Sequence, residues 1–274
     1  MAWGTLIGMT GSETSRAPLN QAALAGRLPA GWQLTVVAET GSTNADLLAA
    51  AERGAADRTA LVAELQTSGR GRLDRGWDSP AGAGLTVSVL LRPPVPNTGW
   101  GWLPLIAGLA LCRSLGERAR LKWPNDLLMG DEQAKVAGIL GESSGDAVVL
   151  GIGINVSTIA EELPVPTASS LALQGHPVLD RSELLANLLL GLDAELARWY
   201  AADGNAVAAG IAGDYRSRCA TLGREVSVQL PDGTERGRAM AVDDLGRLVV
   251  QPTGGGEPIV VAAGDVTHIR AVPE

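Results

Sequence analysis

The sequence predicts an α/β (α+β) protein with a small β barrel at its C-terminal end. Between residues 31 and 221, short apolar runs of strand length alternate with longer helix-like segments and glycine-rich turns. After residue 222 the pattern changes to short strands of alternating hydrophobicity, separated by turn sequences. Hydrophobic residues make up 46% of the 274 residues, which is enough to bury a sizeable core.

The region before residue 222 is expected to form one main domain behind a short leader of residues 1–30. Its second helix begins at Thr43, where Thr43 and Asp46 match the capping box Ser/Thr-x-x-Asp/Glu, and it ends at Gly54. A polar, glycine-rich loop covers 66–82, and an irregular segment covers 157–180. We expect strands at 33–38, 60–65, 85–92, 119–123, 127–129, 135–143 and 147–156, and helices at 16–28, 43–54, 101–118, 181–201 and 204–220.

The last part of the chain, 222–274, is expected to be a separate module of about 50 residues. Four strands are predicted in it, over 224–230, 235–242, 247–252 and 258–264. The turn sequences between them are PDG (231–233), DDLG (243–246) and GGG (254–256). Short strands joined by such turns predict a small β barrel.

Charge and cysteine usage limit the classes of function. A net charge of -8 argues against general binding of DNA or of anionic membranes, so any phosphate chemistry needs a local basic patch. The two cysteines, Cys112 and Cys219, have neither metal-ligand spacing nor a disulfide framework. No signal peptide and no apolar run of membrane-spanning length are recognisable. We therefore expect a cytoplasmic protein.

One segment concentrates positive charge in this acidic chain. In QTSGRGRLDRGW (66–77), Arg70, Arg72 and Arg75 alternate with glycines in a loop between two strands. Glycine lets the backbone approach a ligand closely, and the arginine fork pairs with phosphate or carboxylate oxygens. The pattern favours an anion site, although a solvated basic loop or an RNA-binding arginine–glycine tract would have the same composition.

The only two lysines of the chain lie in two further motifs. Lys122 opens KWPND (122–126), which would otherwise be an ordinary turn, and a compact ammonium group is suited to phosphate. Lys135 opens KVAGIL (135–140), where Gly138 leaves room beside the backbone; a strand-end lysine extending to solvent is the alternative. In GIGIN (151–155), glycines within a strand and Asn155 in an apolar run indicate close ligand approach.

Other nucleotide-binding and catalytic motifs are absent or weak. The chain contains neither the dinucleotide-binding pattern G-x-G-x-x-G nor the P-loop pattern. GESSG (141–145) matches the nucleophile elbow of serine hydrolases, but that chemistry needs a histidine. The two candidates, His176 and His268, lie in the irregular segment and near the C-terminal end, and they are better explained as surface or core residues.

TGSTN (40–44), GRGRLDRGW (69–77), KWPND, KVAGIL and GIGIN, in this order, resemble the biotin protein ligases over about residues 35–270. The resemblance implies a catalytic domain (31–221) with a mixed, largely antiparallel sheet and helices, similar to class II aminoacyl-tRNA synthetases, followed by an SH3-like domain (222–274). It indicates the monofunctional type, because the leader is too short for the N-terminal DNA-binding domain that some members carry.

The resemblance also implies the reaction: biotin and ATP form biotinyl-5′-AMP, and biotin is then transferred to a lysine of a biotin carboxyl carrier domain. Magnesium would be carried by ATP, with no protein metal ligand. Lys135, Arg70 and Lys122 would be catalytic. By similarity, biotin would contact Ser42, Thr43, Asn44, Gln66, Arg70, Gly71, Arg72, Lys135 and Gly138, and ATP would contact Arg70, Arg72, Trp77, Lys122, Asn125, Asp126 and Asn155.

Two alternative functions remain open at this stage. A lipoate or octanoate ligase or transferase of the same superfamily would share the fold, although the polar set at 42–44 and 66 favours a ureido ring. A nucleic-acid-binding protein could use the arginine–glycine loop, but the acidic net charge and the single short basic segment argue against it. A homodimer is compatible with the sequence, as is a monomer.

Overall fold

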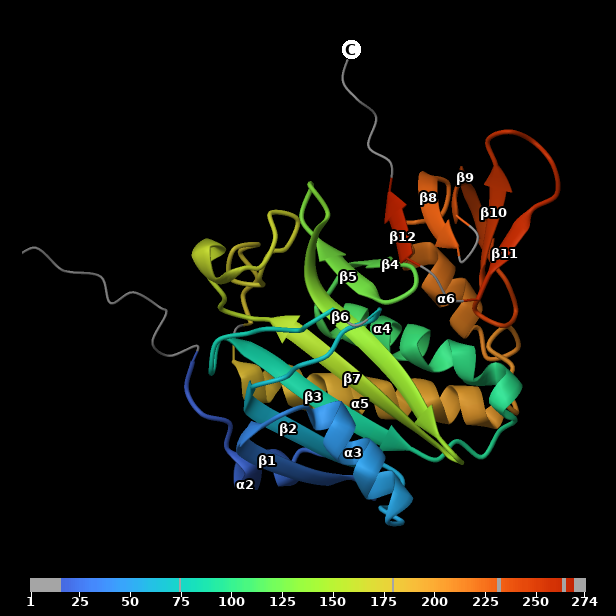
Figure 1. The fold of residues 1–274 in the computed structure, drawn as a ribbon. Coiled ribbons are helices and arrows are strands. Elements are labelled where there is room, and N and C mark those ends of the chain that lie inside the picture. Colours follow the sequence, from blue (N-terminus) through green and yellow to red (C-terminus); the bar gives the residue numbers. More distant parts are fainter. Residues whose placement is uncertain (1–15, 74, 179, 231–232, 263–264, 269–274) are drawn as a thin grey trace, which may run out of the picture.

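The computed structural model describes residues 16–73, 75–178, 180–230, 233–262 and 265–268, and it contains two β-sheets (Figure 1). The first part of the expected leader, residues 1–15, lies outside the described residues. The strand order of the main sheet is β1-β2-β3-β7-β6-β5-β4. Its strands are β1 (Gln33–Thr40), β2 (Thr59–Gln66), β3 (Gly84–Leu91), β4 (Arg120–Lys122), β5 (Asp126–Met129), β6 (Ala134–Ser144) and β7 (Ala147–Asn155).

The main sheet is mixed and largely antiparallel, as expected. Strands β1 and β2 pair in parallel, and helix α3 (Thr43–Glu52) forms the crossover between them. The other described pairings in this sheet are antiparallel. Each of the seven strands was predicted from its apolar run, with ends that differ by one or two residues.

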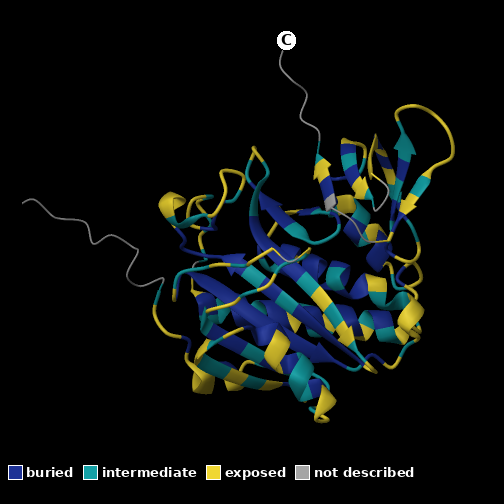
Figure 2. Cartoon of the chain, in the orientation of Figure 1, coloured by how far each residue is buried: buried dark blue, intermediate teal, exposed yellow. Residues whose placement is uncertain are grey.

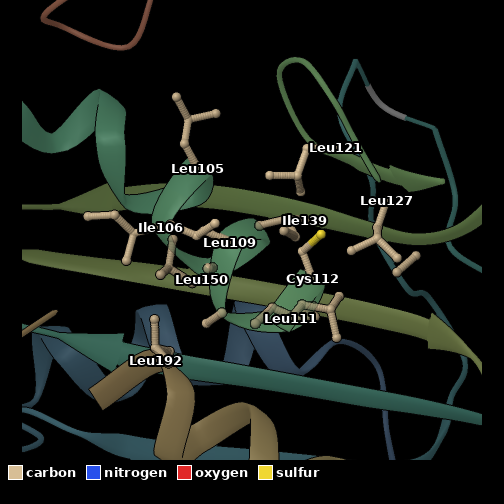
Figure 3. Packing of buried hydrophobic residues seen from close by; sticks show 14 of the residues in the cluster. Leu105, Ile106, Leu109, Leu111, Cys112, Leu121, Leu127, Ile139, Leu150 and Leu192 are labelled. Atoms are coloured by element: carbon tan, nitrogen blue, oxygen red, sulfur yellow. The ribbon is translucent and has the colours of Figure 1, made fainter. Parts of the chain in front are cut away.

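Two helices cover one face of the main sheet. Helix α4 (Leu103–Ser114) packs on helix α5 (Arg181–Ala201), and both lie against the sheet. Figure 3 shows Ile106, Leu109 and Cys112 of α4 next to Ile139 and Leu150 of the sheet. The central strands are buried along their length, which Figure 2 shows as the dark blue middle of the sheet. This layer is the main hydrophobic core.

The opposite face is covered only in part. Helix α3 packs there on β3 and β7, where Leu47 and Ala51 contact Leu90 and Val149 in a small separate cluster. Because side chains alternate along a strand, Thr86 and Ser88 of β3 share this face with Gly151 and Gly153 of β7, which are their register partners. These positions lie beyond the N-terminal end of α3.

A β-bulge in β6 changes which side chains reach this face. Asp126 pairs with Gly138 and Leu127 with Ala137, but Leu128 pairs with Lys135, so Val136 is the extra residue. Alternation counted along β6 alone would place Lys135 on the opposite face from Gly138. The bulge instead places Lys135 on the same face as Gly138 and Asp126.

The second sheet has the strand order β11-β10-β9-β8-β12. Its strand β12 was not predicted, because the run after the fourth strand is short and lacks clear alternation. The sheet rests against the main domain through two tryptophans: Trp102 Nε1 donates to Asp244 O at 2.8 Å, and Trp123 Nε1 donates to Gly246 O at 2.9 Å. The strands are β8 (Glu225–Leu230), β9 (Gly233–Val242), β10 (Leu248–Pro252), β11 (Ile259–Val261) and β12 (Asp265–His268).

The remaining helices are shorter than the sequence indicated. Helix α2 (Gln21–Ala25) and helix α6 (Ile211–Arg218) fall inside the ranges predicted for them. Gly210 precedes α6 in a left-handed conformation with φ of 74°, which a continuing helix cannot contain. Two short 3-10 helices, η1 (Asn97–Trp102) and η2 (Ala160–Glu162), complete the fold. In the described part of the chain, every helix is too short or too polar to cross a membrane.

Replacing Trp102 with alanine should lower the free energy of unfolding by about 3–5 kcal/mol, because Trp102 is fully buried between the two sheets and the substitution leaves a cavity. Urea unfolding followed by circular dichroism measures this loss. Trp100→Ala is the matched control, since Trp100 lies in the same 3-10 helix but is only partly buried. Equal losses in the two variants would contradict a special role of Trp102 between the sheets.

Candidate functional site

One cavity of about 700 Å³ opens on the face of the main sheet that α4 and α5 leave free. Every site residue predicted from the sequence lines it, although these residues come from five separate motifs. The structure therefore brings the predicted set together: Ser42, Thr43, Asn44, Gln66, Arg70, Gly71, Arg72, Trp77, Lys122, Asn125, Asp126, Lys135, Gly138 and Asn155.

The start of α3 forms a buried polar floor at one end of the cavity. The N-cap is Ser42, whose side chain accepts from Ala45 N, so the N-cap lies one residue before the predicted Thr43. The predicted capping box of Thr43 and Asp46 is wrong, because Asp46 accepts from the Thr40 hydroxyl instead. Thr43 is consequently free to bind Gln66: its N–H donates to Gln66 Oε1 at 2.8 Å and its hydroxyl donates to the same oxygen at 2.9 Å. This pairing fixes the Gln66 side chain beside the cavity.

Asn44 is held on both sides of its amide group. Ser88 Oγ donates to Asn44 Oδ1 at 2.5 Å, and Asn44 Nδ2 donates to Glu142 Oε2 at 2.8 Å. Neither Ser88 nor Glu142 was among the site residues predicted from the sequence. Ser88, which is fully buried, had a usable signal in the sequence, because it interrupts the apolar run VSVLL (87–91). Glu142 gave none, since it stands in a segment that also fits an exposed strand end.

Three glycines of β6 and β7 leave the sheet bare where other side chains need the space. Gly138 and Gly153 are register partners, and the indole of Trp77 lies over them. A Cβ on Gly153 would stand 2.3 Å from Trp77 Cε2, and one on Gly151 would stand 2.2 Å from Asn44 Oδ1. Within the described residues, Trp77 Nε1 is buried against the strand beside Gly153 and has no hydrogen-bond partner.

Both lysines of the chain pair with one carboxylate at the other end of the cavity. Lys135 Nζ lies 2.5 Å from Asp126 Oδ1, and Lys122 Nζ lies 3.5 Å from Asp126 Oδ2. Lys135 Nζ also lies 5.9 Å from the centroid of the Trp77 ring. Since a single carboxylate cannot neutralise two ammonium groups, this end of the cavity is suited to an anionic ligand.

The arginine–glycine loop folds back on itself above the cavity. Arg70 and Gly76 form an isolated β-bridge, and Trp77 N donates to Gly69 O at 2.9 Å. A Cβ on Gly69 would stand 2.1 Å from Trp77 O, so only glycine fits there. Arg70 Nη2 lies 3.0 Å from Glu142 Oε2. The loop therefore closes one side of the cavity with cationic side chains.

Two asparagines of the predicted set are oriented by the backbone. Asn125 Nδ2 donates to Ile139 O at 3.0 Å, and Asn155 Nδ2 donates to Ser169 O at 2.9 Å. One amide N–H of each side chain is thereby committed, which fixes the direction of the amide group in the cavity wall.

The second sheet also contributes to the cavity, through Arg224, Thr267 and His268. The sequence analysis did not assign these residues to the site. His268 Nε2 lies 3.0 Å from Thr221 Oγ1, which accepts from Trp123 N at 2.9 Å. Burial, and then the charges of Lys122 and Arg224, lower the pKa of His268 to about 4, so its imidazole is neutral at pH 7.

The serine-hydrolase alternative does not fit this arrangement. Ser143 lies inside β6 as the register partner of Val148, whereas a nucleophile elbow needs a sharp strand-to-helix turn. His176 contacts the Leu115 and Val178 carbonyl oxygens, and His268 contacts Thr221. Neither histidine pairs with Ser143, so GESSG is an ordinary strand and turn sequence.

Comparison with known proteins supports the sequence resemblance. The biotin/lipoate A/B protein ligase family matches residues 39–158, and the biotin protein ligase C-terminal domain matches residues 221–268. The chain is 44% identical to a biotin–acetyl-CoA-carboxylase ligase of Mycobacterium tuberculosis, over 96% of this chain and 100% of the relative. It is 33% identical to the ligase of the same name from Paracoccus denitrificans, over 83% and 98%. The structure of a biotin protein ligase from Aquifex aeolicus in complex with biotin and ATP matches with a TM-score of 0.70 and 30% identity, covering 87% of this chain and 99% of that one.

Gly153→Ala should lower the free energy of unfolding by about 1–3 kcal/mol, because the added methyl group collides with the Trp77 ring on a rigid strand. Chemical denaturation measures the loss. Gly213→Ala is the control: it makes the same change in α6 where nothing lies within 4 Å, and it should be neutral or stabilising. The double variant Gly153→Ala/Trp77→Ala removes the collision, so it should cost less than the sum of the single variants; additive costs would show that the ring is not the obstacle.

Proposed function

The chain belongs to the biotin protein ligase family, and on that basis we propose that it activates biotin with ATP and then attaches biotin to a lysine of a carrier protein. The observation that carries the proposal is that one cavity has a hydrogen-bonding floor at one end and the only two lysines of the chain at the other. Such a cavity can bind a neutral ring system at its polar floor and an anionic group at its lysines.

Biotin would lie with its ureido ring on the polar floor. Ser42, Thr43, Asn44 and Gln66 supply both donors and acceptors there, and a ureido group needs both. Gly138 leaves the room on the sheet that the Trp77 indole and the end of the Lys135 side chain occupy beside the ligand. The chain from the ring to the carboxylate would then run towards Lys135 and the loop residues Arg70, Gly71 and Arg72.

Activation requires two anions to meet. A biotin carboxylate oxygen attacks the α-phosphorus of ATP, an O–P bond forms, and the bond from that phosphorus to the bridging oxygen breaks to release pyrophosphate. The ammonium group of Lys135 would contact both anions, while Arg70, Arg72 and Lys122 offset their repulsion and the charge that develops in the transition state. Asp126 orients both lysines before the substrates arrive.

ATP would occupy the end of the cavity near Lys122, Asn125, Asp126 and Asn155, and Trp77 lies between this end and the polar floor, where either substrate can contact it. We propose that magnesium enters bound to ATP and neutralises phosphate charge. Among the described residues, no group of three or more His, Cys, Asp or Glu side chains could hold a metal ion.

In the second step the neutral amine of a carrier lysine attacks the acyl carbon, an amide bond forms, and AMP leaves with the electron pair of the broken C–O bond. The acceptor proposed for this chain is the biotin carboxyl carrier domain of a biotin-dependent carboxylase, in the cytoplasm. A second copy of the chain is a further proposed partner, which analytical ultracentrifugation would detect.

The purified protein should catalyse ATP–pyrophosphate exchange that depends on biotin, because formation of the acyl-adenylate is reversible. Lipoate and octanoate are run in parallel at the same concentrations. Exchange with biotin alone supports the proposal. Exchange with lipoate or octanoate instead would assign the chain to the other branch of the superfamily, and absence of exchange with all three acids would overturn adenylation as its activity.

Lys135→Ala should reduce biotin-dependent exchange by about 100-fold or more, by analogy with the removal of a transition-state donor. Lys135→Met keeps an apolar side chain of similar length but lacks the charge, so it should lose as much. Arg120→Met is the control, since Arg120 is an exposed cation on β4, two strands away from Lys135, and does not line the cavity. Near-normal exchange by the two Lys135 variants would remove Lys135 from this role.

A further inference from the structure

We propose that Glu142 is a positioning residue that fixes both the amide group of Asn44 and the guanidinium group of Arg70, and thereby couples the polar floor to the arginine–glycine loop. Glu142 stands on the same face of β6 as Gly138, but it does not line the cavity assigned to the substrates. It lines a second cavity of about 560 Å³, which shares the arginine–glycine loop with the first. It therefore acts through its neighbours.

One carboxylate oxygen of Glu142 accepts both hydrogen bonds. Asn44 Nδ2 lies 2.8 Å from Oε2, and Arg70 Nη2 lies 3.0 Å from the same atom. A carboxylate can only accept, so it can bind only the NH₂ side of the Asn44 amide. The oxygen of that amide must then face Ser88, which donates to it at 2.5 Å. Glu142, together with the more distant Leu140 carbonyl oxygen at 3.4 Å from Nδ2, thus determines which atom of Asn44 is presented as an acceptor.

These bonds form a path from the polar floor to the loop. Ser88 Oγ lies 2.7 Å from Thr43 Oγ1, which donates to Gln66 Oε1 at 2.9 Å. Each hydroxyl carries one hydrogen, which Thr43 gives to Gln66 and Ser88 gives to Asn44, so the two hydroxyls are in contact without a hydrogen bond of their own. The hydrogen-bonded path therefore runs from Ser88 through Asn44 and Glu142 to Arg70. Among the interactions described, Glu142 is the only residue that joins the floor to Arg70 of the loop.

The two bonds differ in how easily they can be broken. Asn44 is 4% exposed, and besides Glu142 its Nδ2 has only the Leu140 carbonyl oxygen at 3.4 Å, so loss of Glu142 would leave one buried N–H unsatisfied, which is costly. The Arg70 side chain is 44% exposed, and water screens an ion pair at that exposure. An incoming carboxylate or phosphate can compete for Arg70 while Asn44 keeps its partner. Glu142 is therefore a permanent support for the floor and an exchangeable anchor for the loop.

Two substitutions separate these roles. Glu142→Ala removes both bonds: the KM for biotin should rise about 10-fold with kcat changed less than about 3-fold, and trypsin should cleave the ligand-free loop at Arg70, Arg72 or Arg75 faster than in the wild type. Glu142→Gln retains an oxygen that can accept from Asn44 but lacks the charge that attracts Arg70. It should restore the KM for biotin and still show faster cleavage.

Two further variants serve as controls for the effects of the Glu142 substitutions. Ser88→Ala removes the other partner of Asn44 without touching Arg70, so it should raise the KM for biotin and leave loop cleavage unchanged. Ser144→Ala, two residues along β6 from Glu142, should change neither measurement. Circular dichroism checks that each variant is folded, and the isosteric Glu142→Gln variant retains a test if Glu142→Ala does not fold.

The inference rests on the proposed biotin-binding role of Asn44. Measuring both the KM for biotin and the cleavage of the loop distinguishes a wrong role for Glu142 from a wrong proposed function. Absence of biotin-dependent exchange in the wild type would refute the proposed function, while the cleavage measurement would still test the bond to Arg70. Unchanged cleavage in Glu142→Ala and Glu142→Gln would overturn the anchor. If the wild type is active, an unchanged KM for biotin in Glu142→Ala would show that Glu142 does not fix the Asn44 amide. A KM raised as much in Glu142→Gln as in Glu142→Ala would overturn that role as well.

Discussion

The site depends on one extra residue in β6. Side chains alternate strictly along a regular strand, so a regular β6 would direct Lys135 towards α4 and the hydrophobic core, where an unpaired ammonium group is not tolerated. The bulge at Val136 reverses the alternation and places Lys135 above Gly138, next to Asp126. Because β6 is bonded on both sides, to β5 and β7, the position of this lysine is set by the hydrogen bonding of the sheet.

The second requirement is empty space on the same face. The face of a sheet is normally covered by a layer of side chains, and a ligand would lie on top of that layer. Here Gly138 and Gly153 are paired across two strands and Gly151 follows on the same face, so an indole and an amide lie directly on the backbone. Polar and aromatic groups that come from loops and helices are thereby held by the most rigid part of the fold.

Much of this could be predicted from the sequence. The apolar runs gave all seven strands of the main sheet, and the clustering of arginine, lysine and glycine in an acidic chain gave residues that line one cavity. Local patterns could not give the bulge, because it appears only in the pairing of β5 with β6. They also missed Glu142, Arg224 and His268, whose positions depend on contacts between segments far apart in the chain. The helix start at Thr43 was correct, but the N-cap was assigned to Thr43 instead of Ser42, because serine and threonine side chains can both act as N-caps.

The placement of both lysines has a consequence for self-modification. An acyl-adenylate acylates primary amines, and one that escaped from the cavity would label any accessible lysine on the surface of the enzyme that made it. This chain has no lysine outside the cavity: its other side-chain cations are arginines, whose guanidinium groups stay protonated and do not act as nucleophiles at neutral pH. Its two ε-amino groups share Asp126 inside the cavity. A carrier lysine thus competes with no surface ε-amine of the enzyme itself.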